Sequence, residues 1–412
     1  MFLVVRPLIA LFLLSVYLPC SFADDEPLRT AARRVVDVKH IGLDLDVDLK
    51  GRSVSGTATI DFTPLRNELQ VLELDAVELD VQQVTVTAPD GSTVDADWET
   101  TDSQLQVLFS DEAAMPRRGE SWRVTIRYAT RNPRAGLYFF GPTDVEPNVP
   151  LTVWSQGEPR GSRYWFPCVD QPNEKQTTEL IATVDAGNQV LSNGVLVSKT
   201  DVAGGSEGNG RQRFHWKQNQ EHTAYLVTMV VGDFVVEQET WRGRPVTYYV
   251  PKERAADIKR TFGHTGEMLE FFSEKFGIEY PWDQYAQVVV EQFIWGGMEN
   301  TSATTLYDRT MHDERALLDS TPDWLIAHEL GHQWWGDLVT CKDWSHLWLN
   351  EGFATYSEVL WAEHQLGRDE RDWHLLDDLR AARTGTTQSL PVVDRRYRHP
   401  GSMFDSRVYP KG

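Results

Sequence analysis

The sequence predicts an α+β protein of more than one domain, in which an antiparallel β domain precedes a mixed domain rich in helix. The chain has 412 residues, enough for two or three domains. Alternating polar and apolar residues, or β-branched runs, recur from residue 35 to about 235. From about residue 252, apolar residues recur at helical spacing. We therefore expect an N-terminal β domain over residues 24–235 and a mixed domain over residues 236–412.

The expected strands of the first domain are short segments such as SVSGTATIDF, WRVTIRYA and TAYLVTMVVGDFVV. Turn signals separate them, as at Pro89-Asp90-Gly91 and in the Gly/Ser/Asn stretch at 204–210. The second domain begins with apolar residues at helical spacing, namely Ile258, Phe262, Leu269, Phe272 and Phe276. It continues with a strand at 284–293 and with helices at 321–337, 350–365 and 370–383.

The first 23 residues predict an export signal. Arg6 supplies positive charge, residues 7–19 are apolar, and Ser21-Phe22-Ala23 fits a cleavage site. An uncleaved membrane anchor is the alternative, but the apolar core is shorter than the roughly 20 residues that span a bilayer. We therefore expect an exported protein (periplasmic, cell-surface or extracellular) with no stable membrane span after signal removal.

Charge and cysteine content narrow the function classes. The formal net charge of −21 argues against a nucleic-acid-binding protein, which carries a basic patch on a basic domain. Removal of the signal leaves Cys168 and Cys341. Two cysteines so far apart do not make a disulfide framework, although a bridge between them is possible.

The stretch HELGHQWW, residues 328–335, has the spacing of a zinc-binding motif. His328 and His332 are four residues apart, so on a helix both imidazoles project from one face and can share a metal. Glu329 would lie beside the open side of that metal, where it can take a proton from water. Catalytic zinc requires a third ligand, and Glu351 in WLNEGFATYSE supplies one. The alternative is a chance match on a buried helix, which the third ligand makes a poor explanation.

These stretches resemble a known family. HELGHQWWGDLVT followed by LWLNEGFATYSE is similar to the zinc site of the gluzincin aminopeptidases, the M1 family of aminopeptidase N and leukotriene A4 hydrolase. The resemblance implies a thermolysin-like mixed α/β zinc-peptidase domain, one Zn²⁺ per chain, and peptide substrates with a free N-terminus. It makes His328, His332 and Glu351 the metal ligands and Glu329 the general base.

The segment GGMEN points to the substrate. In the family this segment lines the cleft as an edge strand, which implies substrate-binding roles for Gly296, Gly297, Met298, Glu299 and Asn300. The resemblance assigns Glu299 to the free α-amino group of the peptide. A fixed carboxylate about 4 Å from an ammonium contributes about 4 kcal/mol before desolvation, at an effective dielectric constant of about 20. For Asn300 the alternative is a glycosylation acceptor, because the next two residues complete the sequon.

A second segment, SQGEPRGSRYWFPCVDQPNEK at 155–175, resembles the family segment that reaches from the β domain into the cleft. The resemblance places Glu158 where the family has its second amine-binding residue, and Gln156 near the first substrate side chain. Outside this context Glu158 would be a solvated loop carboxylate.

The stretch VYPKG at 408–412 resembles the family's Y-x-K-G, whose tyrosine donates a hydrogen bond to the oxyanion of the tetrahedral intermediate. This implies a catalytic role for Tyr409. Members of the family continue through further catalytic helices and usually a helical C-terminal domain. We therefore expect that the catalytic domain is incomplete at its C-terminus and that the chain is a fragment of a longer protein.

The predicted activity is hydrolysis of the N-terminal peptide bond of peptides with a free α-amino group. Zinc would activate water and polarise the carbonyl, and Glu329 would take the water's proton. Zinc and Tyr409 would stabilise the oxyanion. Asp337 is a weaker candidate for orienting a ligand histidine, the alternative being a plain helix-end acid.

Three other functions stay open. A zinc endopeptidase could use the same ligands, although GGMEN and Glu158 argue for an amine-binding end of the cleft. Epoxide hydrolysis is possible by analogy with one branch of the family. A non-catalytic zinc- or peptide-binding protein is the third, against which the presence of Glu329 and Tyr409 argues.

Overall fold

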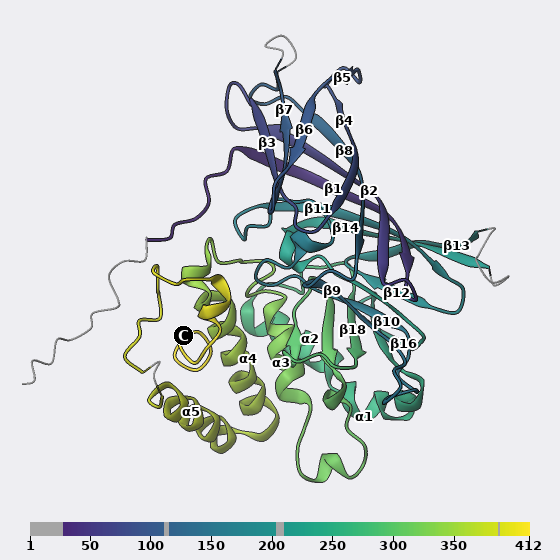
Figure 1. Ribbon diagram of the computed structural model, residues 1–412. Helices are drawn as coiled ribbons and strands as arrows, with labels where there is room; N and C mark the ends of the chain where they lie inside the picture. The colour runs from purple at the N-terminus through teal and green to yellow at the C-terminus, as the bar shows by residue number, and fades with distance from the viewer. Residues whose placement is uncertain (1–27, 111–114, 203–209, 386–387) are drawn as a thin grey trace, which may run out of the picture.

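The computed structural model describes residues 28–110, 115–202, 210–385 and 388–412, and Figure 1 shows their arrangement. The expected signal at residues 1–23 lies outside the described residues, so export stays a prediction. Strands fill the upper part of Figure 1, and the helices gather in the lower part beside the C-terminal segment. Within the described ranges, no helix is long and apolar enough to cross a membrane.

The largest sheet has eight strands, each of which buries the apolar side of an alternating pattern. In β1 (Val36–Asp48), a β-bulge between Val38 and His40 shifts the alternation by one residue, so that Ile41 and the apolar residues after it stay on the core face. Neighbouring strands are antiparallel except β1 and β11, which pair in parallel. The order is β13 (Val195–Val202), β14 (Arg211–Thr223), β11 (Lys175–Asp185), β1, β2 (Ser53–Pro64), β8 (Trp122–Arg131), β4 (Asp80–Thr87) and β5 (Thr93–Val94).

Two smaller sheets share one hydrophobic core with the large sheet. One has the order β3 (Val71–Asp75), β7 (Gln104–Leu108), β6 (Asp97–Thr100). The other has the order β12 (Gln189–Ser192), β15 (Met229–Gly232), β10 (Thr152–Gln156), β9 (Gly136–Phe140). All five residues of β10 are buried. The chain that leaves β10 at Gln156 therefore starts from a fixed position.

A mixed five-stranded sheet begins directly after β15, close to the expected boundary between residues 235 and 236. Its order is β16 (Phe234–Trp241), β17 (Arg244–Pro251), β18 (Tyr285–Val290), β20 (Ala303–Tyr307), β19 (Gly297–Met298). Strand β18 is buried on both faces, because Val288 belongs to the core of the first sheets and Val289 to a second core under the helices. This explains why apolar residues fill both faces of the strand, with the buried Gln287 as the exception.

In the described part of the chain, five α-helices follow or interrupt this sheet: α1 (Ile258–Phe262), α2 (Thr265–Phe276), α3 (Asp323–His332), α4 (Trp348–Leu366) and α5 (Arg368–Ala382). Short 3-10 helices connect other elements: η2 (Ser162–Tyr164), η3 (Ala224–Leu226), η4 (Lys252–Asp257), η5 (Asp308–Thr310), η6 (Ala316–Leu318), η7 (Trp344–His346) and η8 (Pro400–Met403). Phe272 and its apolar neighbours bury one face of α2, as the spacing predicted.

Helices α3 and α4 pack closely and position the functional residues. Helix α3 ends at His332 rather than near residue 337. From Gln333 the backbone hydrogen bonds tighten to the i−3 pattern, and the chain then turns at Gly336, whose φ of +128° suits glycine. Gly331 permits the close contact, since a Cβ atom there would lie 2.6 Å from Ser357 Oγ. Residues early in α4 face the end of α3 and later residues face its middle, so the two helices run antiparallel.

Candidate active site

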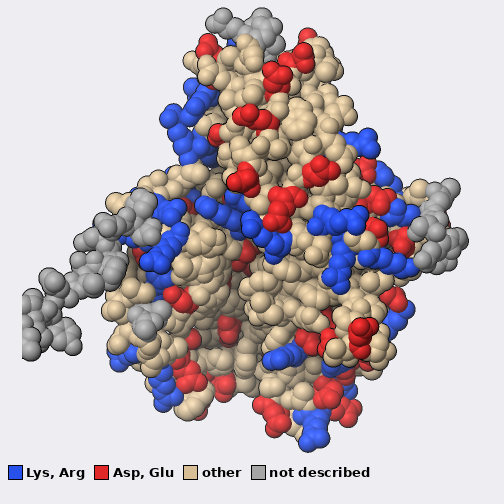
Figure 2. All heavy atoms as spheres, viewed as in Figure 1, with Lys and Arg blue, Asp and Glu red and all other residues tan. Residues whose placement is uncertain are grey.

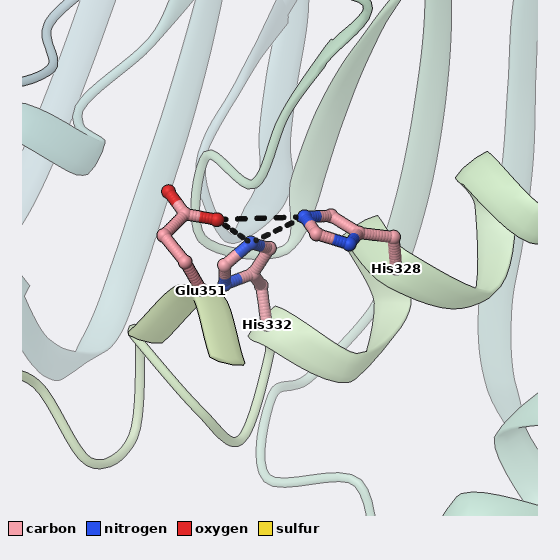
Figure 3. Close-up of side chains that lie close together, drawn as sticks. All are labelled: His328, His332 and Glu351. Carbon is pink, nitrogen blue, oxygen red and sulfur yellow. Dashed lines mark hydrogen bonds and ion pairs between the residues drawn. The ribbon is translucent and has the colours of Figure 1, made fainter. Parts of the chain in front are cut away.

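Helices α3 and α4 bring three metal-binding side chains together. Glu351 Oε2 lies 3.5 Å from His328 Nε2 and 3.2 Å from His332 Nε2, and the two Nε2 atoms are 3.1 Å apart. Figure 3 shows the three side chains pointing toward one position. Their ligand atoms all lie within 4.8 Å of one another. Two histidine nitrogens and one carboxylate oxygen make a ligand set of catalytic zinc, which leaves a coordination position for water or substrate.

The outer nitrogen of each histidine has a hydrogen-bond acceptor. His328 Nδ1 is 2.8 Å from Glu358 Oε1, and His332 Nδ1 is 2.8 Å from the carbonyl oxygen of Trp335. When both Nδ1–H groups donate, the Nε2 lone pairs are available to a metal. These contacts therefore support the ring orientations and tautomers that a metal site requires.

Burial and neighbouring charges shift the pKa values of the ligands. Burial raises the pKa of Glu351, but His332 and His328 offset this effect and lower that pKa to about 2. Burial lowers the pKa of His332, but the Glu299 and Glu351 carboxylates raise it to about 9. The cluster therefore favours bound positive charge, and its three donors fit Zn²⁺.

Glu329 follows the first ligand on α3 and lines the same cavity. Its side chain packs against Gly297, where a Cβ atom would lie 2.0 Å from Glu329 Oε1. It is 4% exposed, and its Oε2 has no hydrogen-bond partner. Burial raises its pKa to about 8, although the two ligand histidines oppose this shift. The carboxylate therefore has an oxygen available for proton exchange within the cavity.

A cavity of about 450 Å³ opens over the three metal-binding side chains. Figure 2 shows a hollow on this face of the molecule with acidic side chains inside it. Its lining carries five glutamates and, among the described residues, no lysine or arginine. The lining residues are Gln156, Glu158, Pro159, Trp295, Gly297, Met298, Glu299, Leu325, His328, Glu329, His332, Glu351, Glu358, Gly401, Phe404 and Tyr409. The cavity therefore favours a cationic group on its ligand.

Two of these glutamates come from separate sheets. Glu158 follows β10 of the four-stranded sheet, and Glu299 follows β19 at the edge of the five-stranded sheet. The Oε1 atom of each is buried without a hydrogen-bond partner. Burial raises the pKa of Glu158, and the Glu299 carboxylate raises it further. Burial likewise raises the pKa of Glu299. A buried carboxylate oxygen without a partner is costly, and a cation bound between Glu158 and Glu299 would reduce that cost for both.

The other predicted substrate-binding residues fall into two groups. Gln156 and Met298 line the cavity, and Gln156 Nε2 donates to Met298 Sδ at 3.2 Å. Gly296 and Asn300 do not line it. Asn300 is fully buried, and its Nδ2 donates to Thr305 Oγ1 at 3.1 Å. The structure thus places the Asn300 side chain in the protein interior, bonded to Thr305 and away from the cavity lining.

Tyr409 lies on the C-terminal segment beside the metal-binding side chains. It lines the cavity, and its ring centroid is 6.2 Å from that of His328. Burial, followed by the nearby Glu351 carboxylate, raises the pKa of its hydroxyl. The phenol therefore stays protonated and keeps a hydrogen to donate.

Sequence comparison identifies the family of this site and of the sheets that support it. The model of the Peptidase M1 N-terminal domain matches residues 37–226, and that of the Peptidase family M1 domain matches residues 260–412. The chain belongs to peptidase family M1. The M1 resemblance found in the sequence motifs is thereby confirmed, as is zinc as the expected cofactor, since the three donors have the required geometry.

Relatives and solved structures cover most of this M1 chain. Leucine aminopeptidase 2 of Saccharomyces cerevisiae is 30% identical over 326 residues, 78% of this chain and 45% of the relative. Leukotriene A-4 hydrolase of Xenopus laevis is 28% identical over 354 residues, 82% of this chain and 52% of the relative.

Among solved structures, the M1 zinc metallopeptidase of Deinococcus radiodurans has a TM-score of 0.70 at 26% identity, covering 93% of this chain and 82% of that one. The native yeast LTA4 hydrolase structure gives 0.74 at 25% identity, covering 92% and 58%. The chain spans about half the length of the curated relatives it matches.

One residue that contacts a ligand of this M1 site was missed in the sequence. Asp337 was the candidate for orienting a ligand histidine, but Glu358 makes that contact. Asp337 is fully buried, and its carbonyl oxygen accepts from Lys175 Nζ at 2.8 Å. The signal for Glu358 was its spacing, since seven residues after Glu351 is two turns along the same helix face.

The two cysteines in the described part of the chain do not form a bridge. Cys168 and Cys341 are both buried as free thiols. Burial raises the pKa of each thiol, so both remain protonated. The disulfide that the sequence left possible is absent between them, and both cysteines act as small core residues.

Proposed function

We propose that this protein is a zinc-dependent aminopeptidase that hydrolyses the N-terminal peptide bond of peptides with a free α-amino group. The observation that carries the proposal is that Glu158 and Glu299 each have a buried carboxylate oxygen without a hydrogen-bond partner, in the cavity that holds the metal-binding side chains. An ammonium group is the complement of such a pair. Only the first peptide bond of a substrate anchored there would lie over the metal position.

The metal ligands supply the first element of the chemistry. His328, His332 and Glu351 would hold Zn²⁺, which when bound polarises the scissile carbonyl and acidifies water. Glu329 then takes a proton from the attacking water and passes it to the leaving amine. Its place directly after the ligand His328, in the lining of the same cavity, puts its carboxylate close to the position where the water would be bound.

Tyr409 supplies the second element. Its position beside His328 puts a protonated phenol within the reaction cavity. We propose that its O–H donates a hydrogen bond to the carbonyl oxygen as negative charge develops there. A donor that is held in place before the reaction stabilises the transition state without any reorganisation of the site. The reaction rate should therefore depend on how firmly the C-terminal segment holds Tyr409.

Relatives support an aminopeptidase. Two of them are called leucine aminopeptidase 2 of Saccharomyces cerevisiae and aminopeptidase N of Lactobacillus helveticus. A mutant of the Deinococcus radiodurans enzyme was solved bound to a Tyr-Ser-Ala substrate, with a TM-score of 0.72 to this chain. A free tripeptide of this kind carries the N-terminal ammonium that the two glutamates would bind.

An assay on paired substrates tests the proposal. The zinc-loaded chain would be given an aminoacyl-arylamide and its N-acetylated twin, with and without a chelator. We expect chelator-sensitive cleavage of the free-amine substrate alone, because acetylation removes the charge that Glu158 and Glu299 bind. Equal cleavage of the two substrates would contradict the proposal and indicate an endopeptidase-like cleft.

A further inference from the structure

A short N-terminal arm, residues 28–34, runs beside the C-terminal part of the chain (Figure 1). Arg29 makes most of the contact. Its backbone N–H donates to the Arg395 carbonyl oxygen at 2.7 Å, and Arg395 Nε donates back to the Arg29 carbonyl oxygen at 3.0 Å. Its guanidinium donates to the carbonyl oxygens of Tyr397 at 3.2 Å and Arg398 at 2.9 Å. The two segments are therefore joined through both backbone and side chain.

The side chain of Arg29 also packs on an aromatic ring. Its guanidinium carbon lies 5.5 Å from the centroid of Tyr397, which is 6% exposed. A planar cation over a largely buried ring adds an attraction to the two hydrogen bonds. Lysine could keep a charge and hydrogen bonds at this position, but its ammonium lacks the planar group that stacks on the ring.

The segment that Arg29 contacts leads directly into the wall of the substrate cavity. The wall segment, residues 395–409, contributes Gly401, Phe404 and Tyr409 to the cavity lining. Its later part is held by Arg407, which pairs with Asp394 at 2.8 Å and donates to the Ser402 carbonyl oxygen at 2.7 Å. Arg407 therefore ties Asp394, directly before the wall segment, to the middle of that segment, and the N-terminal arm binds residues 395–398 between these points.

The other end of the arm is fixed to the β region. Asn173 Nδ2 donates to the Ala32 carbonyl oxygen at 2.8 Å, and Arg34 pairs with Glu174 at 2.5 Å. Glu174 is 1% exposed and also accepts from the Val38 backbone N–H. The arm thus connects a buried anchor in front of β11 to the start of the wall segment.

We infer that the N-terminal arm is a strap that sets the position of the cavity wall, and that Arg29 is its positioning residue. This inference rests on the proposed aminopeptidase function. Arg29 touches neither substrate nor metal, so it acts through the backbone of residues 395–398. Loss of its contacts frees residues 395–398, which lead into Gly401, while the contacts of Arg407 with Asp394 and Ser402 hold the flanking residues and keep Tyr409 in place.

Kinetics of Arg29→Ala on the free-amine arylamide test this inference. We expect KM to rise about fivefold and kcat to change less than about twofold, because the variant loosens a binding wall and leaves the reacting groups in place. Arg29→Lys should give a smaller rise in KM, and it replaces Arg29→Ala if that variant does not fold. Arg123→Ala is the matched control, since Arg123 pairs with Asp61 on the exposed face of the large sheet.

Hydrogen–deuterium exchange gives a readout that does not depend on activity. In Arg29→Ala, amides of residues 395–404 should exchange faster than in the wild type, while those of α3 should not change. If amides of residues 395–404 exchanged at the wild-type rate in Arg29→Ala, the inference that the arm positions the cavity wall would be wrong. Faster exchange there with an unchanged KM would also contradict it. If the wild-type chain cleaved neither substrate but the variant still exchanged faster there, the proposed function would fail and the strap would stand as a structural connection.

Discussion

Glu358 and His328 form a carboxylate–histidine pair across two helices, with Glu358 Oε1 2.8 Å from His328 Nδ1. A carboxylate in this position orients the ring and increases the basicity of the metal-binding nitrogen. We predict that Glu358→Ala weakens zinc binding by about 10- to 100-fold. Competition with a chelating dye of known zinc affinity would measure this. Glu363→Ala is the control. Glu363 lies on α4, as Glu358 does, but its carboxylate pairs with Arg371 of α5 and not with a metal ligand. An unchanged zinc affinity in Glu358→Ala would show that the pair is only structural.

Glu329 separates metal binding from catalysis. Its carboxylate lines the cavity, but Glu329 is not one of the three metal-binding residues. We predict that Glu329→Gln retains stoichiometric zinc while kcat falls by about 10²- to 10⁴-fold, the usual contribution of a general base. Metal analysis and steady-state kinetics on the same preparation would check both parts. A variant with an undiminished rate would remove Glu329 from the mechanism.

Tyr409 is expected to act on the transition state more than on substrate binding. We predict that Tyr409→Phe lowers kcat by about 10²-fold and changes KM little, because only the developing oxyanion needs the lost O–H. Tyr356→Phe on the exposed side of α4 is the matched control, since Tyr356 is 47% exposed. A rise in KM with an unchanged kcat would instead place the hydroxyl in ground-state binding.

His222 makes stability depend on pH away from the active site. The ring is fully buried, with Nε2 2.8 Å from Thr178 Oγ1. Burial, aided by the Lys175 charge, lowers its pKa from 6.5 to about 3. A depressed pKa means that its stabilising contribution is complete above pH 6.5 and is lost as pH falls toward 3. Between pH 7 and pH 5 the loss amounts to about 2 kcal/mol.

Urea unfolding at pH 7 and pH 5 would measure that loss. We predict that the difference in unfolding free energy between the two pH values shrinks by about 2 kcal/mol in His222→Gln. His364→Gln is the matched control, because His364 lies at the surface beside Glu267. If His222→Gln kept the wild-type pH dependence, another group would be responsible for the acid sensitivity.

The sequence motifs predicted much of the site because its spacing is helical. His328 and His332 had to share a helix face, and a third ligand on a following helix could reach them only if the two helices packed antiparallel. The structure has this arrangement. The order of β region and mixed region was also predicted, because alternation and helical spacing differ plainly along the chain.

Other features depended on tertiary contacts that no local pattern contains. The parallel pairing of β1 with β11 joins segments more than a hundred residues apart. The end of α3 at His332, before a turn at Gly336, is not revealed by apolar spacing. The hydrogen bonds of Arg29 to residues 395–398 join segments near the two ends of the described chain. Such contacts become visible only when the fold is known.

The central claim is that Glu299 selects a free amine. The most direct measurement is the ratio of kcat/KM for a free-amine arylamide to that for its N-acetylated twin, in the wild type and in Glu299→Gln. The neutral amide keeps the shape of the side chain but loses the charge, so we predict that the ratio falls by about 10²-fold or more. A ratio that stayed at the wild-type value in Glu299→Gln would contradict the account, because amine selection would then not depend on this carboxylate.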